Sequence, residues 1–408
     1  MIARIKNKLI FLYQRYFIGK FISEYLPFTI NLFLPERSLE IKEQTVKDIV
    51  VANLDSLGDS IWVTPVFKEL RERYPNAKIT LVCNRICLDI FSNNPYIDEI
   101  IDINPTTFYN RIHFHLEISE LSGRNIDLFL ILEMGVRPSD NLKIIAHRLK
   151  AKYIISSELG ILKKLSHNQP RPNSDHSPLW WPHYFLKVIE PLTDKIYTEE
   201  PALKIYPCPQ AEEKIQRWLA SNELLNHNLI LIHPMVAGYG MATKKWPDEY
   251  YQQIISYLNQ SPKNKILISG GPSEVDLCQN LINMCDTEDL ILTAGQFSIK
   301  ELYHLIEKCS LIMTGDTSIL HLATAATRPT ISLFGATNPY KIAPQSHTHI
   351  KFFHSNLECW PCHKNRDFSP YWPKCIYKEA KCLRETGPLE VIHYIHSNYP
   401  HLAIKKEE

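Results

Sequence analysis

Residues 311–336 read LIMTGDTSILHLATAATRPTISLFGA. The pattern of their apolar side chains changes from that of a strand to that of a helix and back to that of a strand. Residues 311–316 form a short apolar run that is typical of a buried strand, and residues 330–336 form another. Between them, residues 318–327 predict a helix whose small side chains allow it to approach a sheet closely. A strand, a helix and a second strand in this order predict a βαβ unit, and therefore a parallel sheet with helices on its faces.

The alternation of strands and helices extends beyond this unit and occurs in two series. The second series has further strands expected at 228–234, 265–271 and 290–295, and helices expected at 247–260, 273–285 and 298–309. The first series has strands expected at 48–53, 77–84, 97–104, 126–133 and 152–156, and helices expected at 61–75 and 141–151. Two such series predict two doubly wound α/β domains with a cleft between the carboxyl ends of their strands, where open α/β sheets bind ligands.

We therefore expect four segments along the chain. Residues 1–45 form a basic and aromatic extension, and residues 46–224 form the first Rossmann-like domain. The latter segment ends in a less regular region at 157–224, which predicts a loop, a helix pair and a linker. Residues 225–385 form the second Rossmann-like domain, and residues 386–408 a C-terminal helix and tail.

The composition argues against several classes of protein. The 408 residues are 45% hydrophobic and 22% charged, as in an ordinary globular protein, and the net charge of +1 argues against a dedicated nucleic-acid-binding protein. No uninterrupted apolar run reaches the ~18 residues of a membrane-spanning helix. Ten cysteines without a secretory signal favour a reducing cytoplasm.

The extension at 1–45 has two interpretations. It carries five basic side chains before its first acid, Glu24, with aromatic and aliphatic residues between them. This pattern is typical of a helix in a membrane interface, which would make the protein peripheral on the inner face of the cytoplasmic membrane. It is equally typical of a helix whose apolar face packs on the main body of the protein.

Three loops at strand ends of the second domain carry candidate ligand-binding residues. Their functional interpretation is an anion site made of lysines, hydroxyls and helix N-terminal N–H groups, with a carboxylate for ribose hydroxyls. Their structural interpretation is solvated lysines, an acid that compensates a helix dipole and a histidine in the core. The residues concerned are Thr243, Lys244, Glu274, Asp316, Thr317, Ser318 and His321.

The first domain carries one more candidate in VANLDSLGDSIWVTP (51–65), where Asp59 is expected to open the helix after the first strand. Aspartate is a favoured helix N-cap, and a Gly-Asp pair is commonly a turn. The alternative is a carboxylate that takes part in chemistry at the end of the strand.

These blocks together resemble glycosyltransferase family 9, the ADP-heptose:lipopolysaccharide heptosyltransferases, over roughly residues 46–395. The resemblance lies in LDSLGDSIWVTPVFKELRERYPNAKITLV, HP…TKKWP, GGPSEVD and, most specifically, GDTSILHLATAATRPTISLFGATNP. It implies a GT-B arrangement of two Rossmann-like domains with an interdomain cleft, and an inverting sugar transfer without a catalytic metal.

The resemblance also implies roles for individual residues. Asp59 would be the general base that takes a proton from the acceptor hydroxyl. Lys244 would contact the donor diphosphate, Glu274 the ribose, and Phe297 the nucleotide base. Thr243 lies in the same donor loop, and the diphosphate and sugar would be held by Asp316, Thr317, Ser318 and His321. The chain departs from the family at Asn53, where an arginine is common, and at Ser318, where a glycine is common.

Four cysteines near the C-terminus form a C-x2-C-x12-C-x6-C pattern, at Cys359, Cys362, Cys375 and Cys382. Four thiolates suit a structural Zn or Fe site, and the alternatives are two disulfides or free thiols. A similar segment in related protein heptosyltransferases resembles an iron-binding finger.

The leading hypothesis is therefore a heptosyltransferase that uses a nucleotide-sugar donor, with ADP-heptose expected, and a lipid-linked saccharide acceptor. The alternatives are a protein O-heptosyltransferase of the same fold and a non-catalytic nucleotide-sugar-binding subunit. A binding subunit would need neither Asp59 nor the complete donor loops.

Overall fold

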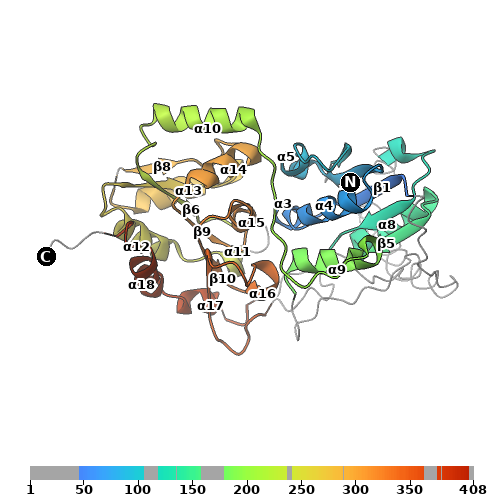
Figure 1. Cartoon of the computed structure of the whole chain (residues 1–408). Helices are drawn as coiled ribbons and strands as arrows, with labels where there is room; N and C mark the ends of the chain where they lie inside the picture. Colours follow the sequence, from blue (N-terminus) through green and yellow to red (C-terminus); the bar gives the residue numbers. More distant parts are fainter. Residues whose placement is uncertain are drawn as a thin grey trace, which may run out of the picture.

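The computed structural model describes residues 46–104, 118–134, 136–157, 179–236, 241–287, 289–362, 375–377 and 379–403. These residues form two lobes that lie side by side (Figure 1). The extension at 1–45 lies outside the described residues, as does the part of the irregular region at 158–178.

The first lobe contains a five-stranded parallel sheet in the order β3-β2-β1-β4-β5. The chain order reverses between β1 and β4, and such a switch point opens a crevice at the carboxyl ends of the strands. All five predicted strands are confirmed, at β1 (Asp48–Asn53), β2 (Lys78–Asn84), β3 (Glu99–Ile103), β4 (Leu128–Ile131) and β5 (Tyr153–Ser156).

The second lobe contains a six-stranded parallel sheet in the order β11-β10-β9-β6-β7-β8, with its switch point between β9 and β6. Its strands are β6 (Asn228–His233), β7 (Asn264–Ile268), β8 (Leu290–Leu292), β9 (Leu311–Gly315), β10 (Thr330–Phe334) and β11 (Ile350–His354). Strand β11 was not predicted from the sequence. Its five residues lie at the sheet edge, where Lys351 is exposed, so the apolar run is broken.

The helix expected at 61–75 is confirmed as α4 (Thr64–Arg73), but a separate short helix, α3 (Leu57–Ile61), precedes it. Pro65 lies in the first turn of α4, where its missing N–H costs nothing, but proline disfavours a continuous helix through the residue before it. The hydroxyl of Thr64 donates to the carbonyl of Ile61 at 2.8 Å and closes the bend.

The remaining helices cover the sheets. In the first lobe these are η2 (Arg85–Cys87), α5 (Leu88–Phe91), η3 (Ile118–Leu121), α8 (Val136–Arg148) and α9 (Trp181–Thr193). The chain then continues through α10 (Pro209–Ser221), α11 (Met241–Lys244), α12 (Asp248–Leu258), η6 (Pro272–Glu274), α13 (Val275–Met284), α14 (Ile299–Lys308), α15 (Ser318–Ala325), α16 (Pro339–Ile342), α17 (Lys381–Glu385) and α18 (Pro388–Asn398). The predicted helix pair and C-terminal helix correspond to α9, α10 and α18.

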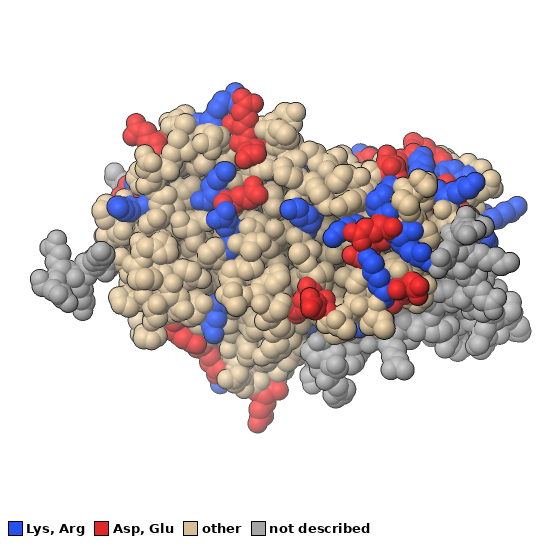
Figure 2. Space-filling view, viewed as in Figure 1, with Lys and Arg blue, Asp and Glu red and all other residues tan. Residues whose placement is uncertain are grey.

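Two of these helices pack on the second lobe although they lie outside the expected second domain. Helix α10 packs on α14, and α18 packs on α12 (Figure 1). The domain boundaries at 224 and 385 remain predictions. On the face drawn in Figure 2, basic and acidic side chains are interspersed rather than gathered by sign.

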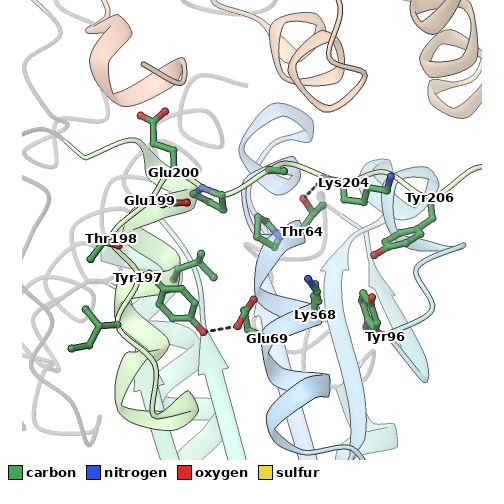
Figure 3. Close-up of a pocket in the computed structure, with 15 residues that line it drawn as sticks. Thr64, Lys68, Glu69, Tyr96, Tyr197, Thr198, Glu199, Glu200, Lys204 and Tyr206 are labelled. Atoms are coloured by element: carbon green, nitrogen blue, oxygen red, sulfur yellow. Dashed lines mark hydrogen bonds between the residues drawn. The ribbon is translucent and has the colours of Figure 1, made fainter. Parts of the chain in front are cut away.

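The linker between α9 and α10 is bound to both lobes. On the first lobe, the Lys204 N–H donates to the Thr64 hydroxyl at 3.2 Å and the Tyr197 hydroxyl donates to Glu69 at 3.0 Å (Figure 3). On the second lobe, the carboxylate of Glu200 accepts hydrogen bonds from the N–H and the hydroxyl of Ser346. A pocket of about 570 Å³ lies between the linker, α4 and α9. The residues that line it include none of the candidate site residues.

We predict that Gly335→Ala destabilises the second lobe. Gly335 follows β10, and a Cβ there would overlap the backbone carbonyl oxygen of Thr243. Overpacking of this kind costs about 1–3 kcal/mol, which chemical denaturation would measure as a lower free energy of unfolding. Gly387→Ala is the control, since its Cβ would meet no atom within 4 Å. An equal cost for both variants would contradict the close approach at Gly335.

Candidate active site

Asp59 lies in the helix that follows the central strand of the first sheet. Helix α3 begins at Leu57, with Ser56 at the N-cap position, so the expectation that Asp59 opens the helix is wrong by two residues. Asp59 is half-buried, and its Oδ2 accepts a hydrogen bond from the Ser56 hydroxyl at 2.8 Å. The N-cap position is therefore filled by another residue, and the carboxylate of Asp59 is oriented by the turn before it.

Helix α3 is fixed to the sheet by a buried hydrogen-bond chain. The Ser60 hydroxyl donates to the side-chain oxygen of Asn53 at 2.7 Å, and the Asn53 amide donates to the carbonyl of Leu132 at 2.6 Å. Asn53 and Ser60 are both fully buried. Asn53, where the family commonly has arginine, thus links β1, α3 and the end of β4.

The two lobes meet where α3 packs on α15 (Figure 1). A Cβ on Gly58 would lie 2.9 Å from Cδ2 of His321 and 3.3 Å from the Cα of Ser318, so glycine allows this approach. The indole N–H of Trp62 donates to Nδ1 of His321 at 3.1 Å. The contact therefore places the segment that carries Asp59 beside His321 and Ser318, two of the donor-site candidates of the second lobe.

His321 is buried and neutral in this contact. Burial lowers the pKa of its imidazole to about 4, although the negative charges of Asp316 and Asp59 act in the opposite direction. The side chain is therefore a hydrogen-bonding group rather than a cation at neutral pH.

Lys244 and Asp316 form a buried ion pair with 2.5 Å between Nζ and Oδ2. Burial opposes the ionisation of Asp316, but the charge of Lys244 outweighs it and the pKa of the carboxyl lies below its usual value. A carboxylate repels a diphosphate and a lysine attracts one, so the pair favours different roles for the two residues. Lys244 suits the diphosphate, while Asp316 suits the orientation of Lys244 and hydrogen bonds from sugar hydroxyls.

Thr317 and Ser318 begin α15 beside this ion pair. The Thr317 hydroxyl caps the helix, because its oxygen accepts from the N–H of Ile319 at 3.3 Å and also bonds the Thr314 hydroxyl at 2.9 Å. Ser318 is half-buried at the contact with Gly58. Thr317 therefore shapes the loop, and Ser318 lies at the junction of the lobes.

The other donor-site candidates lie on neighbouring loops of the second sheet. Thr243 is buried, and its carbonyl accepts the N–H of Ala336 at 3.2 Å, which joins α11 to the loop after β10. The carboxylate of Glu274 accepts the N–H of Gly271 at 2.6 Å and closes the turn of η6. Phe297 packs edge to face on Trp218 of α10, with 5.1 Å between ring centroids.

Two acids that the sequence analysis did not select lie next to Asp59. Glu133 is fully buried at the end of β4 and accepts the backbone N–H of Leu54. Burial, followed by the charge of Asp55, raises the pKa of its carboxyl well above the ordinary value. Asp55 accepts the N–H of Met134 at 3.1 Å. The sequence pattern that could have indicated Glu133 is an acidic residue directly after the apolar run of β4.

The four C-terminal cysteines are close enough to influence one another. Cys382 is buried, and burial together with the neighbouring Cys362, Cys375 and Cys359 raises the pKa of its thiol to about 11. Within the described ranges, however, no three or more cysteine, histidine or acidic side chains are arranged to hold a metal. The metal site therefore remains a prediction, and residues 363–374 between the pairs lie outside the described part.

Comparisons with known proteins find related sequences and a shared fold. Residues 173–372 match the model of the family described as glycosyltransferase family 9 (heptosyltransferase). The chain is similar to lipooligosaccharide heptosyltransferase 2 of Campylobacter jejuni, with 24% identity over 342 residues that cover 83% of this chain and 95% of the relative. It is also similar to lipopolysaccharide heptosyltransferase 3 of Escherichia coli K12, with 27% identity over 349 residues and coverages of 81% and 96%.

The fold is shared with a solved structure described as the E. coli ADP-heptose lps heptosyltransferase II. The TM-score is 0.64 at 17% sequence identity, and the match covers 86% of this chain and 98% of the other. The expected α/β fold, with two Rossmann-like domains in the GT-B arrangement, is therefore confirmed.

We predict that Glu133→Gln raises stability, and by more at higher pH. Burial makes the ionised form of Glu133 unfavourable in the folded state. The contribution of this carboxyl to stability is therefore complete below its unfolded-state pKa near 4.5, and it is lost as the pH rises through the folded-state pKa. Each unit by which the pKa is raised corresponds to about 1.4 kcal/mol. Denaturation between pH 5 and pH 8 should show a growing difference from the parent. Glu213→Gln, on the exposed face of α10, should show no such trend.

Proposed function

We propose that this chain, which belongs to glycosyltransferase family 9, transfers a heptose from ADP-heptose to a hydroxyl of a lipopolysaccharide-core saccharide. One observation carries the proposal. The contact of α3 with α15 brings a half-buried carboxylate of one lobe, Asp59, near His321 of the other, and the charges of Asp316 and Lys244 act on the same histidine. The names of the similar proteins supply the sugar and the acceptor class.

On the acceptor side, Asp59 acts as the general base. Its carboxylate takes the proton from the acceptor hydroxyl while that oxygen forms a bond to the anomeric carbon of the donor. The bond between this carbon and the diphosphate oxygen breaks, and the nucleoside diphosphate leaves with the electron pair. Attack from the face opposite the nucleotide inverts the anomeric configuration. The hydrogen bond from Ser56 keeps the carboxylate directed as the reaction requires.

On the donor side, the second lobe stabilises the leaving diphosphate. Lys244 provides the positive charge, held in place by Asp316. The loop residues Thr243, Thr317 and Ser318 complete this part of the site. Glu274 binds the ribose hydroxyls, and Phe297 packs on the nucleotide base. In this proposal protein groups supply the electrostatic stabilisation, without a catalytic metal ion.

The acceptor is proposed to be a lipid-linked saccharide at the inner face of the cytoplasmic membrane. None of the helices in the described part is both long and apolar enough to cross a membrane. Contact with the membrane would instead use the basic and aromatic residues at 1–45. The second candidate acceptor is a Ser/Thr-rich protein, which the four-cysteine segment favours because it resembles that of protein heptosyltransferases.

We predict that Asp59→Asn lowers transfer at least ~100-fold with little change in donor binding, because general-base catalysis contributes roughly 10²–10⁴-fold. The assay compares ADP-, GDP- and UDP-sugars, each with a core-saccharide lipid and with a Ser/Thr-rich protein as acceptor. We expect the parent enzyme to use ADP-heptose with the core-saccharide lipid and not with the protein acceptor.

The control is Asp286→Asn, an exposed acid after α13 that should keep parental activity. An active Asp59→Asn enzyme would show that another group is the base. Transfer to the protein but not to the lipid would contradict the proposed lipid acceptor and identify a protein as the acceptor.

We also predict about one Zn or Fe ion per chain, held by Cys359, Cys362, Cys375 and Cys382, since four thiolates suit a structural tetrahedral site. Elemental analysis of anaerobically purified protein would measure it. Cys362→Ser should lose the metal, whereas Cys208→Ser, a cysteine near the start of α10, should retain it. Metal-free parent protein would disprove the site.

A further inference from the structure

Trp62 connects the two lobes at the candidate site through a single hydrogen bond. It directly follows α3, its side chain is 1% exposed, and its Nε1–H donates to Nδ1 of His321 at 3.1 Å. None of the motifs above assigns a role to this residue.

This hydrogen bond determines which nitrogen of His321 carries the proton. An indole N–H is a donor only, so Nδ1 of His321 must be an acceptor and carry no proton. A neutral imidazole has one proton, and burial keeps His321 neutral by lowering its pKa to about 4. The proton therefore lies on Nε2, because the hydrogen bond at one ring nitrogen sets the state of the other.

The protonated edge of the ring lies at the junction of the lobes. Cδ2 and Nε2 of His321 are 2.9 and 3.5 Å from the position of a Cβ on Gly58, the residue before Asp59. No side chain or backbone group of the described residues hydrogen-bonds to Nε2. The charged groups that act on the ring are Asp59 from α3, Asp316 after β9 and Lys244 from α11.

The indole of Trp62 is itself held from both lobes. It stacks on Trp181 of α9 with 6.3 Å between centroids and 17° between ring planes. It meets the His321 ring edge to face at 4.9 Å. With a ring on each side, the indole has little freedom to turn its N–H away from His321.

We propose that Trp62 is a positioning residue that holds His321 in its Nε2–H tautomer, with this N–H donating to an oxygen of the bound nucleotide-sugar. The role rests on the proposed function. Because Trp62 and His321 belong to different lobes, the tautomer is held only while α3 rests on α15. Contact between the lobes thus prepares a hydrogen-bond donor for the substrate.

The direct test is nitrogen NMR of the full chain labelled with ¹⁵N-histidine, with the His321 signals assigned from their loss in His321→Gln. We expect the parent to show a neutral Nε2–H ring at pH 7. Trp62→Phe keeps an aromatic ring but removes the N–H, so it should show a mixture of tautomers or a ring that titrates at higher pH. A parental Nδ1–H tautomer, or an unchanged His321 in a folded Trp62→Phe variant, would overturn the proposal.

Trp180→Phe is the matched control. Its indole N–H also crosses between the lobes, donating to the carbonyl of Ile342 at 3.0 Å, but it does not touch His321. This variant should leave the His321 signals as in the parent. A change as large as that in Trp62→Phe would mean that loss of lobe contact in general, and not the indole at 62, alters the histidine.

Ligand additions identify the oxygen that Nε2–H meets. A shift of its signal with ADP alone points to the diphosphate, and a shift only with ADP-heptose points to a sugar hydroxyl. No shift with either would overturn the part of the proposal that concerns the substrate. These spectra do not depend on turnover, so they test the tautomer of His321 even if the transfer assay shows no activity with any donor.

Kinetics then separate positioning from a general structural effect. Trp62→Phe should lower kcat roughly tenfold, within the range for an unsatisfied buried acceptor, with a smaller change in KM for the donor. The same substitution in a His321→Gln background should cost much less, because a glutamine amide has no tautomers. An equal loss in both backgrounds would show that Trp62 acts through packing alone.

Discussion

The close contact between α3 and α15 is the feature on which the rest of the site depends. Glycine at 58 lets the two helices meet, since a side chain there would press on His321 and on the backbone of Ser318. The approach brings the carboxylate of Asp59 close enough to act on His321 of the other lobe, as do the charges of Asp316 and Lys244. Neither lobe carries both halves of the proposed chemistry, so the site exists only while the helices touch.

The charged groups around this contact are distributed unevenly between the lobes. Asp55, Asp59 and Glu133 gather at the end of the first sheet, where burial and mutual repulsion raise the pKa of Glu133. On the second lobe, the half-buried Lys244 is paired with the buried Asp316. An anionic donor would be repelled by the acidic end of the first lobe, which therefore remains available for a neutral hydroxyl. This division follows the order of the proposed reaction, in which the acceptor loses a proton to the first lobe and the diphosphate leaves on the second.

Several interactions away from the site hold the lobes in this relation. Trp180 donates to α16, and Glu200 of the linker binds the loop before β11 through Ser346. The linker also bonds to Thr64 on α4, the helix that follows α3. Movement of the linker would therefore be transmitted to the segment that carries Asp59 and Trp62.

The sequence by itself determined the two parallel sheets and most of the donor-site candidates, because apolar periodicity and short motifs are local properties of the chain. It also indicated Asp59, through a Gly-Asp pair at a strand end. It did not predict the separate short helix α3, the edge strand β11, or the pairing of Lys244 with Asp316. Trp62 carried no local sign of its role, because that role depends on a residue far away in sequence. Only the tertiary structure decided which nitrogen of His321 is protonated, since the group that determines it comes from the opposite lobe.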